Sequence, residues 1–139
     1  MESPWKKGTT MAITAQQLVA QAKSEISNLS VEEVARELEG DSVTLVDIRE
    51  PDEVRRDGSI PGAVAAPRGM LEFWADPASP YHRPEFDPSG RTILYCASSG
   101  RSALAVQALQ SLGYTDIAHL EGGVKAWKEQ GRPVTYQAP

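Results

Sequence analysis

One stretch of the sequence reads Arg91-Thr-Ile-Leu-Tyr-Cys-Ala-Ser-Ser-Gly-Arg-Ser102. Residues 92–95 have strand character and run directly into Cys96, the only cysteine of the chain. Small residues follow, and an apolar pattern then predicts a helix over residues 102–112. The stretch therefore predicts a strand, a tight turn and a helix N-terminus. Because ligands of open parallel sheets bind outside the carboxyl ends of the strands, this turn is the candidate functional site.

The turn is suited to a negatively charged group. Backbone N–H groups gathered at a helix N-terminus, together with the positive end of the helix dipole, favour an anion. A cysteine in that position is stabilised as a thiolate, which is the reactive form of the side chain. The same pattern also has a structural interpretation, in which Cys96 is a small buried hydrophobe in an ordinary strand-to-helix connection.

The composition limits the classes of function. The chain has 139 residues, enough for one domain with a hydrophobic core, and a formal net charge of -5 with no long basic run, which argues against nucleic acid as the main partner. A single cysteine excludes an intrachain disulfide and a cysteine-cluster metal site, and His82 and His119 make no ligand-spaced pair. We therefore expect no metal site.

The N-terminal sequence carries no apolar run that could act as a signal peptide or a membrane span. A free cysteine without a disulfide framework fits a reducing compartment, so we expect a cytoplasmic protein with no membrane partner. Residues 1–10 are expected to form a disordered leader.

Strand and helix patterns alternate along the chain. Helical patterns are found at residues 14–26, 31–40, 52–56, around 72, 102–112 and 124–129. The second of these begins with a capping box, Ser30-Val-Glu-Glu33, and Gly40 is its expected C′ residue. Strand patterns are found at residues 43–48, 63–66, 92–95 and 117–120, and residues 134–139 are expected to be a loose tail. This alternation predicts an α/β fold with a mainly parallel central sheet flanked by helices.

The least regular segment is residues 67–86, which contains Arg68, Phe73 and Trp74 among four prolines. A long aromatic connection of this kind is often a functional lid. It is equally typical of a cover over the core, and the sequence leaves both interpretations open.

Four separate stretches resemble the signatures of the rhodanese-like domains. Leu45-Val-Asp-Ile-Arg-Glu-Pro-Asp-Glu53 is similar to the first signature, and Gly58-Ser-Ile-Pro-Gly-Ala63 is similar to the second. Cys96-Ala-Ser-Ser-Gly-Arg-Ser102 resembles the active-site loop of that family. Leu120-Glu-Gly-Gly-Val-Lys-Ala-Trp127, followed by Gly131-Arg-Pro133, is similar to the C-terminal signature. The four stretches occur in the expected order. One departure is Ser59, where the family usually has a structural histidine.

The resemblance implies three regions of the chain. Residues 1–29 would be a leader and an additional N-terminal helix, residues 30–134 the rhodanese-like domain, and residues 135–139 a C-terminal tail.

The family also implies a function, that of a single-domain sulfurtransferase. Such a protein moves sulfane sulfur from thiosulfate or a similar donor to a thiophilic acceptor such as cyanide or a thiol. On the family pattern, Cys96 is the nucleophile that carries the sulfur as a persulfide. The residues expected to bind the substrate or the persulfide are Ala97, Ser98, Ser99, Gly100, Arg101, Ser102 and Arg68.

Several of these residues have a second interpretation. Arg101 would equally well form a salt bridge or a helix-start contact, and Arg68 would equally well be a solvated charge. Asp47 and Arg49 are expected to form a structural pair or to hold the loop after the first strand, with a supporting catalytic role as the alternative. Trp74 is a further supporting candidate.

Two other classes of function fit parts of the pattern. A related cysteine phosphatase or arsenate reductase wraps its oxyanion in a loop with five residues between cysteine and arginine. Only four lie between Cys96 and Arg101, and the smaller loop suits one sulfur atom better than a tetrahedral phosphate. A persulfide carrier or partner-binding module without thiosulfate activity, with an acceptor protein as partner, also stays open, as does a redox sensor that needs an external thiol.

Overall fold

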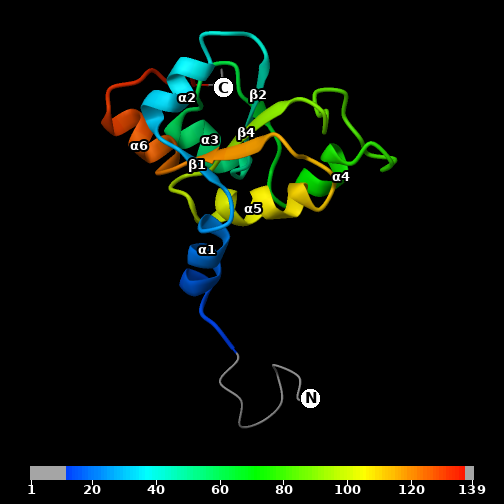
Figure 1. Cartoon of the computed structure of the whole chain (residues 1–139). Coiled ribbons are helices and arrows are strands. Elements are labelled where there is room, and N and C mark those ends of the chain that lie inside the picture. The colour runs from blue at the N-terminus through cyan, green and yellow to red at the C-terminus, as the bar shows by residue number, and fades with distance from the viewer. Residues whose placement is uncertain (1–11, 137–139) are drawn as a thin grey trace.

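The computed structural model describes residues 12–136, so the expected leader and residues 137–139 lie outside the described residues. Its centre is a sheet of five strands, β1 (Ser27–Leu29), β2 (Val43–Asp47), β3 (Val64–Ala65), β4 (Arg91–Tyr95) and β5 (Ile117–Leu120). The strand order is β1-β5-β4-β2-β3, and every neighbouring pair is parallel (Figure 1). The predicted α/β fold with a parallel sheet is thus confirmed.

Helices cover both faces of the sheet (Figure 1). They are α1 (Ala15–Lys23), α2 (Val31–Glu37), α3 (Pro51–Asp57), α4 (Leu71–Ala75), α5 (Gly100–Gln110) and α6 (Gly123–Glu129). Residues of α4 and α5 pack on one face, and residues of α2 and α6 pack on the other. None of the helices within residues 12–136 is long and apolar enough to cross a membrane.

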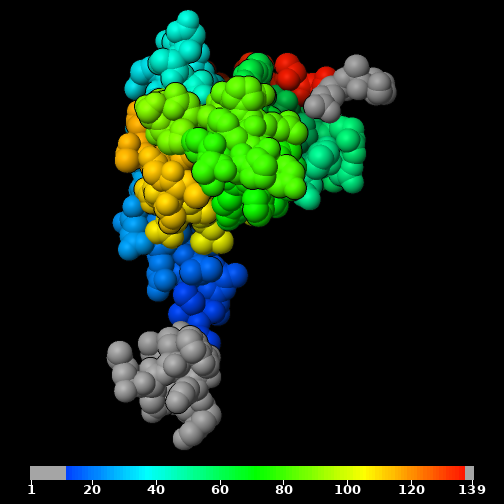
Figure 2. Space-filling model, turned by 90° about the vertical axis from the view of Figure 1, so that its right-hand side faces the viewer, coloured from blue at the N-terminus to red at the C-terminus, as the bar shows by residue number. Residues whose placement is uncertain are grey.

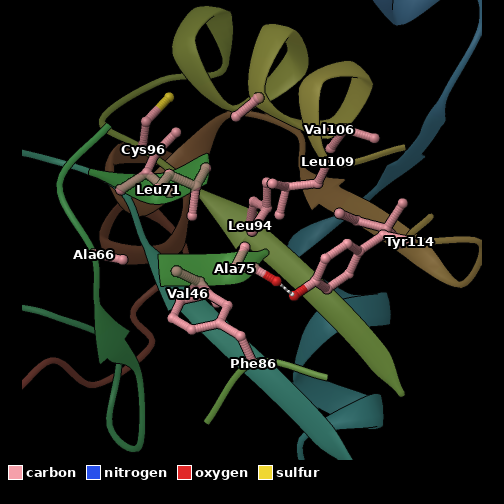
Figure 3. Packing of buried hydrophobic residues seen from close by; sticks show 13 residues of the cluster. Val46, Ala66, Leu71, Ala75, Phe86, Leu94, Cys96, Val106, Leu109 and Tyr114 are labelled. Atoms are coloured by element: carbon pink, nitrogen blue, oxygen red, sulfur yellow. Dashed lines mark hydrogen bonds between the residues drawn. The ribbon is translucent and has the colours of Figure 1, made fainter. Parts of the chain in front are cut away.

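Alternation along β4 divides its side chains between the two faces, because successive residues of a strand point in opposite directions. Ile93 and Tyr95 belong to the cluster with α2 and α6. Leu94 and Cys96 belong to the cluster with α4 and α5 (Figure 3). β4 is the central strand of the sheet, so Cys96, which follows its last residue, lies at the middle of the carboxyl edge.

The helix α1 packs against α5, and its outer part protrudes from the body of the molecule (Figure 2). It begins with a capping box, in which Thr14 accepts from the backbone N–H of Gln17 and Gln17 accepts from that of Thr14. Within α1 only Ala22 is buried, and Leu18 is 45% exposed. The second half of α1 therefore meets α5, with Val19 next to Gly100 and Ala22 buried.

The predicted capping box at Ser30 is confirmed, since Ser30 and Glu33 bond to each other's backbone N–H groups at 3.1 and 2.9 Å. The prediction of Gly40 as the C′ residue is wrong, because Leu38 is the C-cap of α2 and Glu39 therefore occupies the C′ position. The cap N–H of Leu38 bonds to helix carbonyls instead, so the helix ends without a glycine turn.

The strand β1 is absent from the sequence prediction. It has three residues, and only Leu29 is buried, so it carries no hydrophobic period that a pattern could detect. It pairs with β5, and the predicted domain start at residue 30 therefore falls between β1 and α2 of one folded unit.

The expected loose tail is wrong for its first residues. Thr135 forms an isolated antiparallel bridge with Ser59, with both backbone N–H···O distances at 2.8 Å. The Ser59 position, where the resemblance departs from the family, thus holds the C-terminal segment through its backbone.

Candidate active site

The side chain of Cys96 lies at the start of α5. Its Sγ accepts from the backbone N–H of Ser102 at 3.4 Å and lies 3.6 Å from the Ser102 hydroxyl oxygen. Ser102 is the third residue of α5, so the sulfur occupies the position that favours negative charge at a helix N-terminus. Cys96 is 1% exposed, and the sulfur is therefore shielded from bulk water. We call residues 96–101 the Cys96 loop.

The carbonyl groups of the Cys96 loop are bound by α6. The N–H of Val124 donates to the Cys96 carbonyl and that of Lys125 donates to the Ala97 carbonyl, both at 3.0 Å. In a trans peptide the C=O and the next N–H point in opposite directions, so the N–H groups of Ala97 and Ser98 are turned away from α6. The first turn of α6 thus determines which way the loop amides face.

Gly123 is the residue that allows this approach. A Cβ atom at this position would lie 2.5 Å from the carbonyl oxygens of Cys96, Ala97 and Ser98, and the backbone has φ +62°. Only glycine combines this close contact with a left-handed conformation at low cost. The second glycine of the Gly122-Gly123 pair is therefore required by the loop that it touches.

The loop amides that face away from α6 remain free. Within residues 12–136, no backbone N–H from residue 97 to residue 101 donates to a protein acceptor. Ser99 is the N-cap residue of α5, yet its side chain makes no capping bond. Its hydroxyl instead accepts from Lys23 at 2.6 Å and contacts Glu121 at 3.3 Å. The Ser99 side chain consequently accepts no hydrogen bond from the backbone N–H groups at the start of α5.

Lys23 links the N-terminal helix to this site. Its ammonium group also pairs with Glu121 at 2.8 Å, so three elements meet around Ser99. Desolvation by burial raises the pKa of Glu121, but hydrogen bonding and charge from Lys23 dominate, and its pKa is lowered overall. Lys23 and Glu121 were not predicted as site residues, because a single charged residue on a helix or in a turn carries no detectable pattern.

His119 was also missed as a site residue. It lies on β5, is 0% exposed, and its Nδ1 is 2.7 Å from the Ser102 hydroxyl. Burial lowers the pKa of His119 to about 4, while the nearby Glu121 carboxylate acts in the opposite direction and Lys23 reinforces the lowering. The imidazole is therefore neutral at neutral pH.

Arg101 forms a bidentate ion pair with Glu53 of α3, with N···O distances of 2.8 and 2.9 Å. The hydrogen bonds from Arg101 lower the pKa of Glu53 to about 2, against a smaller opposing effect of burial. The side chain of Arg101 remains 40% exposed, so it joins α3 to α5 at the rim of the loop.

Asp47 and Arg49 form a buried ion pair at the carboxyl end of β2. Arg49 donates to Asp47 at 2.6 and 2.9 Å and to the Gly58 carbonyl at 2.7 Å. The Tyr95 hydroxyl donates to Asp47 at 2.8 Å and accepts from the N–H of Ile60 at 3.0 Å. Burial, together with the Asp47 charge, raises the pKa of Tyr95, so this hydroxyl stays protonated. The network holds residues 58–60 on the face of the sheet opposite to the Cys96 side chain.

Within residues 12–136, no hydrogen bond joins Arg68 or Trp74 to the sulfur, whose hydrogen-bond partner is Ser102. Arg68 pairs with Glu72 at 2.6 Å, and the guanidinium of Arg83 stacks over the Trp74 ring at 3.5 Å. Trp74 also packs against the core beside α4. These contacts fit the interpretation of residues 67–86 as a cover over the core.

A pocket of about 370 Å³ lies next to the loop, on the side of α6. It is lined by Asp57, Ala97, Val124, Lys125, Lys128 and Glu129. It touches the loop at Ala97, and Cys96 is not among its lining residues. No group of three or more His, Cys, Asp or Glu side chains within residues 12–136 could hold a metal ion.

Comparison with known proteins identifies the fold family. The family model described as the rhodanese-like domain matches residues 30–130. The chain belongs to the rhodanese-like domain family. A solved structure from Rhodopseudomonas palustris, a protein of unknown function named "Possible Tyrosine Phosphatase", is 39% identical with a TM-score of 0.83. That alignment covers 94% of this chain and 100% of the other.

Two further proteins are similar to this rhodanese-like domain. The polysulfide-sulfur transferase homodimer of Wolinella succinogenes is 29% identical, with a TM-score of 0.71 and 88% of each chain covered. An uncharacterised protein of Synechocystis is 42% identical over 101 residues, which are 71% of this chain and 51% of that protein. The chain thus spans about half the length of the Synechocystis relative. Sulfurtransferases are among the relatives of this domain.

Replacing Gly123 by Ala tests the contact between α6 and the Cys96 loop. We expect Gly123→Ala to lower the free energy of unfolding in urea by about 3 kcal/mol or more, since backbone strain and a clash with three carbonyls act together. Gly131→Ala is the matched control, because Gly131 has φ +77° and open space around its Cβ position, so about 1 kcal/mol of strain is expected. Equal losses in the two variants would contradict the role given to Gly123.

Replacing Asp47 by Asn tests the buried ion pair. The guanidinium of Arg49 would then be buried without a counter-charge, and we expect a loss of about 3–5 kcal/mol in the free energy of unfolding. Tyr95→Phe removes one hydroxyl from the same network and should cost about 1–2 kcal/mol. Urea titrations of both variants measure the difference, and a cost for Asp47→Asn no larger than that for Tyr95→Phe would refute the assignment.

Proposed function

We propose that the protein is a sulfurtransferase that carries sulfane sulfur on Cys96 as a persulfide. The observation that supports this most strongly is the Cys96 loop, whose free N–H groups surround the start of α5 while its carbonyls are bound by α6. A persulfide is an anion and needs donors around it, in the way that an oxyanion hole stabilises an oxyanion. A polysulfide-sulfur transferase among the solved relatives supports the same assignment.

The chemistry proceeds in two half-reactions. The Cys96 thiolate attacks the outer sulfur of thiosulfate, the S–S bond of the donor breaks, and sulfite leaves with the electron pair. The terminal sulfur now carries the negative charge beside the loop amides. A thiophilic acceptor such as cyanide or a thiol then attacks this sulfur, the new S–S bond breaks, and the Cys96 thiolate is restored. No metal or organic cofactor takes part in this scheme.

Within this proposal the residues of the Cys96 loop bind the transferred sulfur mainly through their backbones. Ser98 is exposed and Ser99 is engaged with Lys23, so Ala97, Ser98, Ser99 and Gly100 would act through N–H groups rather than side chains. Ser102 contributes both its N–H and its hydroxyl. A cytoplasmic location is part of the proposal and is supported by the lone reduced cysteine.

The name of the Rhodopseudomonas palustris relative raises a cysteine phosphatase as the second candidate. In that chemistry the arginine after the loop holds the phosphate. Here four residues separate Cys96 from Arg101, and the guanidinium is occupied by Glu53. A phosphate ester would leave a phosphoryl group on the sulfur, whereas thiosulfate would leave one additional sulfur atom, so the mass of the intermediate separates the two functions.

Intact mass after mixing with thiosulfate tests the proposed function. We expect the protein to gain the mass of one sulfur atom, and to lose it on addition of cyanide, because the persulfide forms and is then discharged. Cys96→Ser is the control and should gain nothing, since no other cysteine is present. No gain by wild-type protein with thiosulfate or polysulfide, when its thiol is shown to be free, would rule the function out.

The ion pair between Arg101 and Glu53 allows the role of Arg101 to be tested. If the free N–H groups of Arg101 attract the anionic donor, Arg101→Ala should raise the KM for thiosulfate about tenfold with a smaller change in kcat. Glu53→Gln is the matched variant, because it removes the competing carboxylate and should leave the KM unchanged or lower it. If neither variant changes the KM, Arg101 has only the structural role of joining α3 to α5.

A further inference from the structure

A continuous chain of polar contacts leads from the Cys96 sulfur to Asn28 on the edge strand β1. The Sγ lies 3.6 Å from the Ser102 Oγ, and this oxygen lies 2.7 Å from the Nδ1 of His119. The Nε2 on the other side of the imidazole lies 2.6 Å from the Oδ1 of Asn28. Cys96, Ser102 and His119 are each 0–1% exposed, so bulk water does not reach the contacts among these three residues.

The directions of these hydrogen bonds follow from Asn28. Its Nδ2 donates to the backbone carbonyls of Lys23 and Ile26, at 2.9 and 3.2 Å, which turns its Oδ1 toward His119. An amide oxygen only accepts, so the proton of the neutral imidazole lies on Nε2 and Nδ1 is an acceptor. Ser102 must then donate its hydroxyl proton to Nδ1 at 2.7 Å, in preference to the Ser99 carbonyl oxygen at 3.2 Å. A lone pair of its oxygen is left for the S–H of Cys96.

In this arrangement the Ser102 oxygen can accept the proton of the Cys96 thiol, and the Nδ1 of His119 can accept the proton of Ser102. We propose that Ser102 and His119 form a relay that deprotonates Cys96, with His119 acting through Ser102 as a positioning residue and proton acceptor. The S–H bond of Cys96 breaks as its proton passes to the Ser102 Oγ, and the proton of Ser102 passes to the Nδ1 of His119. The products are a thiolate and an imidazolium, with no change of oxidation state and no further reactant.

The charged groups around His119 influence whether its imidazole is neutral or protonated. From β1 it meets Asn28, from α5 it meets Ser102, and from the turn after β5 the Glu121 carboxylate lies 3.7 Å from its Nε2. This carboxylate favours the imidazolium, while the ammonium of Lys23 on α1 partly cancels it through its own pair with Glu121.

Burial keeps His119 neutral in the resting protein, with its pKa lowered to about 4. A neutral imidazole is available as a proton acceptor at neutral pH. The imidazolium forms only together with the thiolate, whose negative charge compensates it across Ser102. The relay therefore links the loss of the Cys96 proton to its uptake by His119.

The relay extends the proposed sulfurtransferase function. It rests on that function only in that the thiolate formed by the relay is the group that takes up sulfur. Alkylation of the thiol by iodoacetamide tests it without any sulfur donor, so a failure of the relay and a failure of sulfur transfer are told apart. Cys96 is the only cysteine, and the alkylated fraction measured by intact mass reports on this residue alone. The alkylation rate of each variant is measured against pH and divided by its plateau value at high pH. This normalisation removes differences between variants in how easily iodoacetamide reaches the sulfur.

His119→Gln is the decisive variant, because glutamine offers an acceptor for the Ser102 hydroxyl but cannot take up a proton. We expect its normalised alkylation rate to be about tenfold lower than that of wild-type protein at pH 6, which is a displacement of the profile by one pH unit. Ser102→Ala should displace the profile in the same direction, since it breaks the path between sulfur and imidazole. The double variant should match the single variants within about twofold, because both remove one relay.

Two results would overturn the relay. The first is an alkylation profile of His119→Gln that coincides with the wild-type profile, since His119 would then be only a hydrogen-bond acceptor. The second is a double variant whose displacement equals the sum of the two single displacements, since the residues would then act independently. Alanine is small and favourable in a helix, so Ser102→Ala is expected to fold. Its alkylation profile therefore tests the relay even if His119→Gln does not fold.

Discussion

The hydrogen bonds from the first turn of α6 to the carbonyls of the Cys96 loop are the constraint on which the site depends. They fix two loop carbonyls on one side, at Cys96 and Ala97, and the planarity of the peptide bond then turns the N–H groups of Ala97 and Ser98 to the other side. Gly123 makes the approach sterically feasible. Two motifs that are far apart in the sequence, the cysteine loop and the glycine pair, are therefore parts of one structural unit.

A second layer of support comes from the segment that precedes the matched family region. Lys23 of α1 holds the side chain of Ser99, so that Ser99 does not cap α5. Asn28 of β1 orients His119, which in turn bonds to Ser102. The N-terminal helix and the edge strand thus reach the site through polar contacts, while the site's own loop supplies mainly backbone donors.

The sequence predicted the parts of the fold and site that depend on local patterns. The strand into Cys96, the capping box at Ser30 and the alternation of strands and helices are each encoded within a few residues. The role of His119 was not predictable, because one polar residue in a short buried strand has no period and its partners lie 17 and 91 positions away. β1 was missed for the same reason, since a short, largely exposed edge strand lacks a hydrophobic signal.

The central claim is that the amides of the Cys96 loop bind the transferred sulfur. The most direct measurement is the amide proton–nitrogen spectrum of the protein before and after thiosulfate has added sulfur to Cys96. The account predicts that the amide protons of residues 97–101 move downfield when the anionic terminal sulfur accepts their hydrogen bonds, while amides beside the Asp47–Arg49 pair do not move. Loop amides that stay in place, although the mass shows that sulfur has been added, would contradict the account.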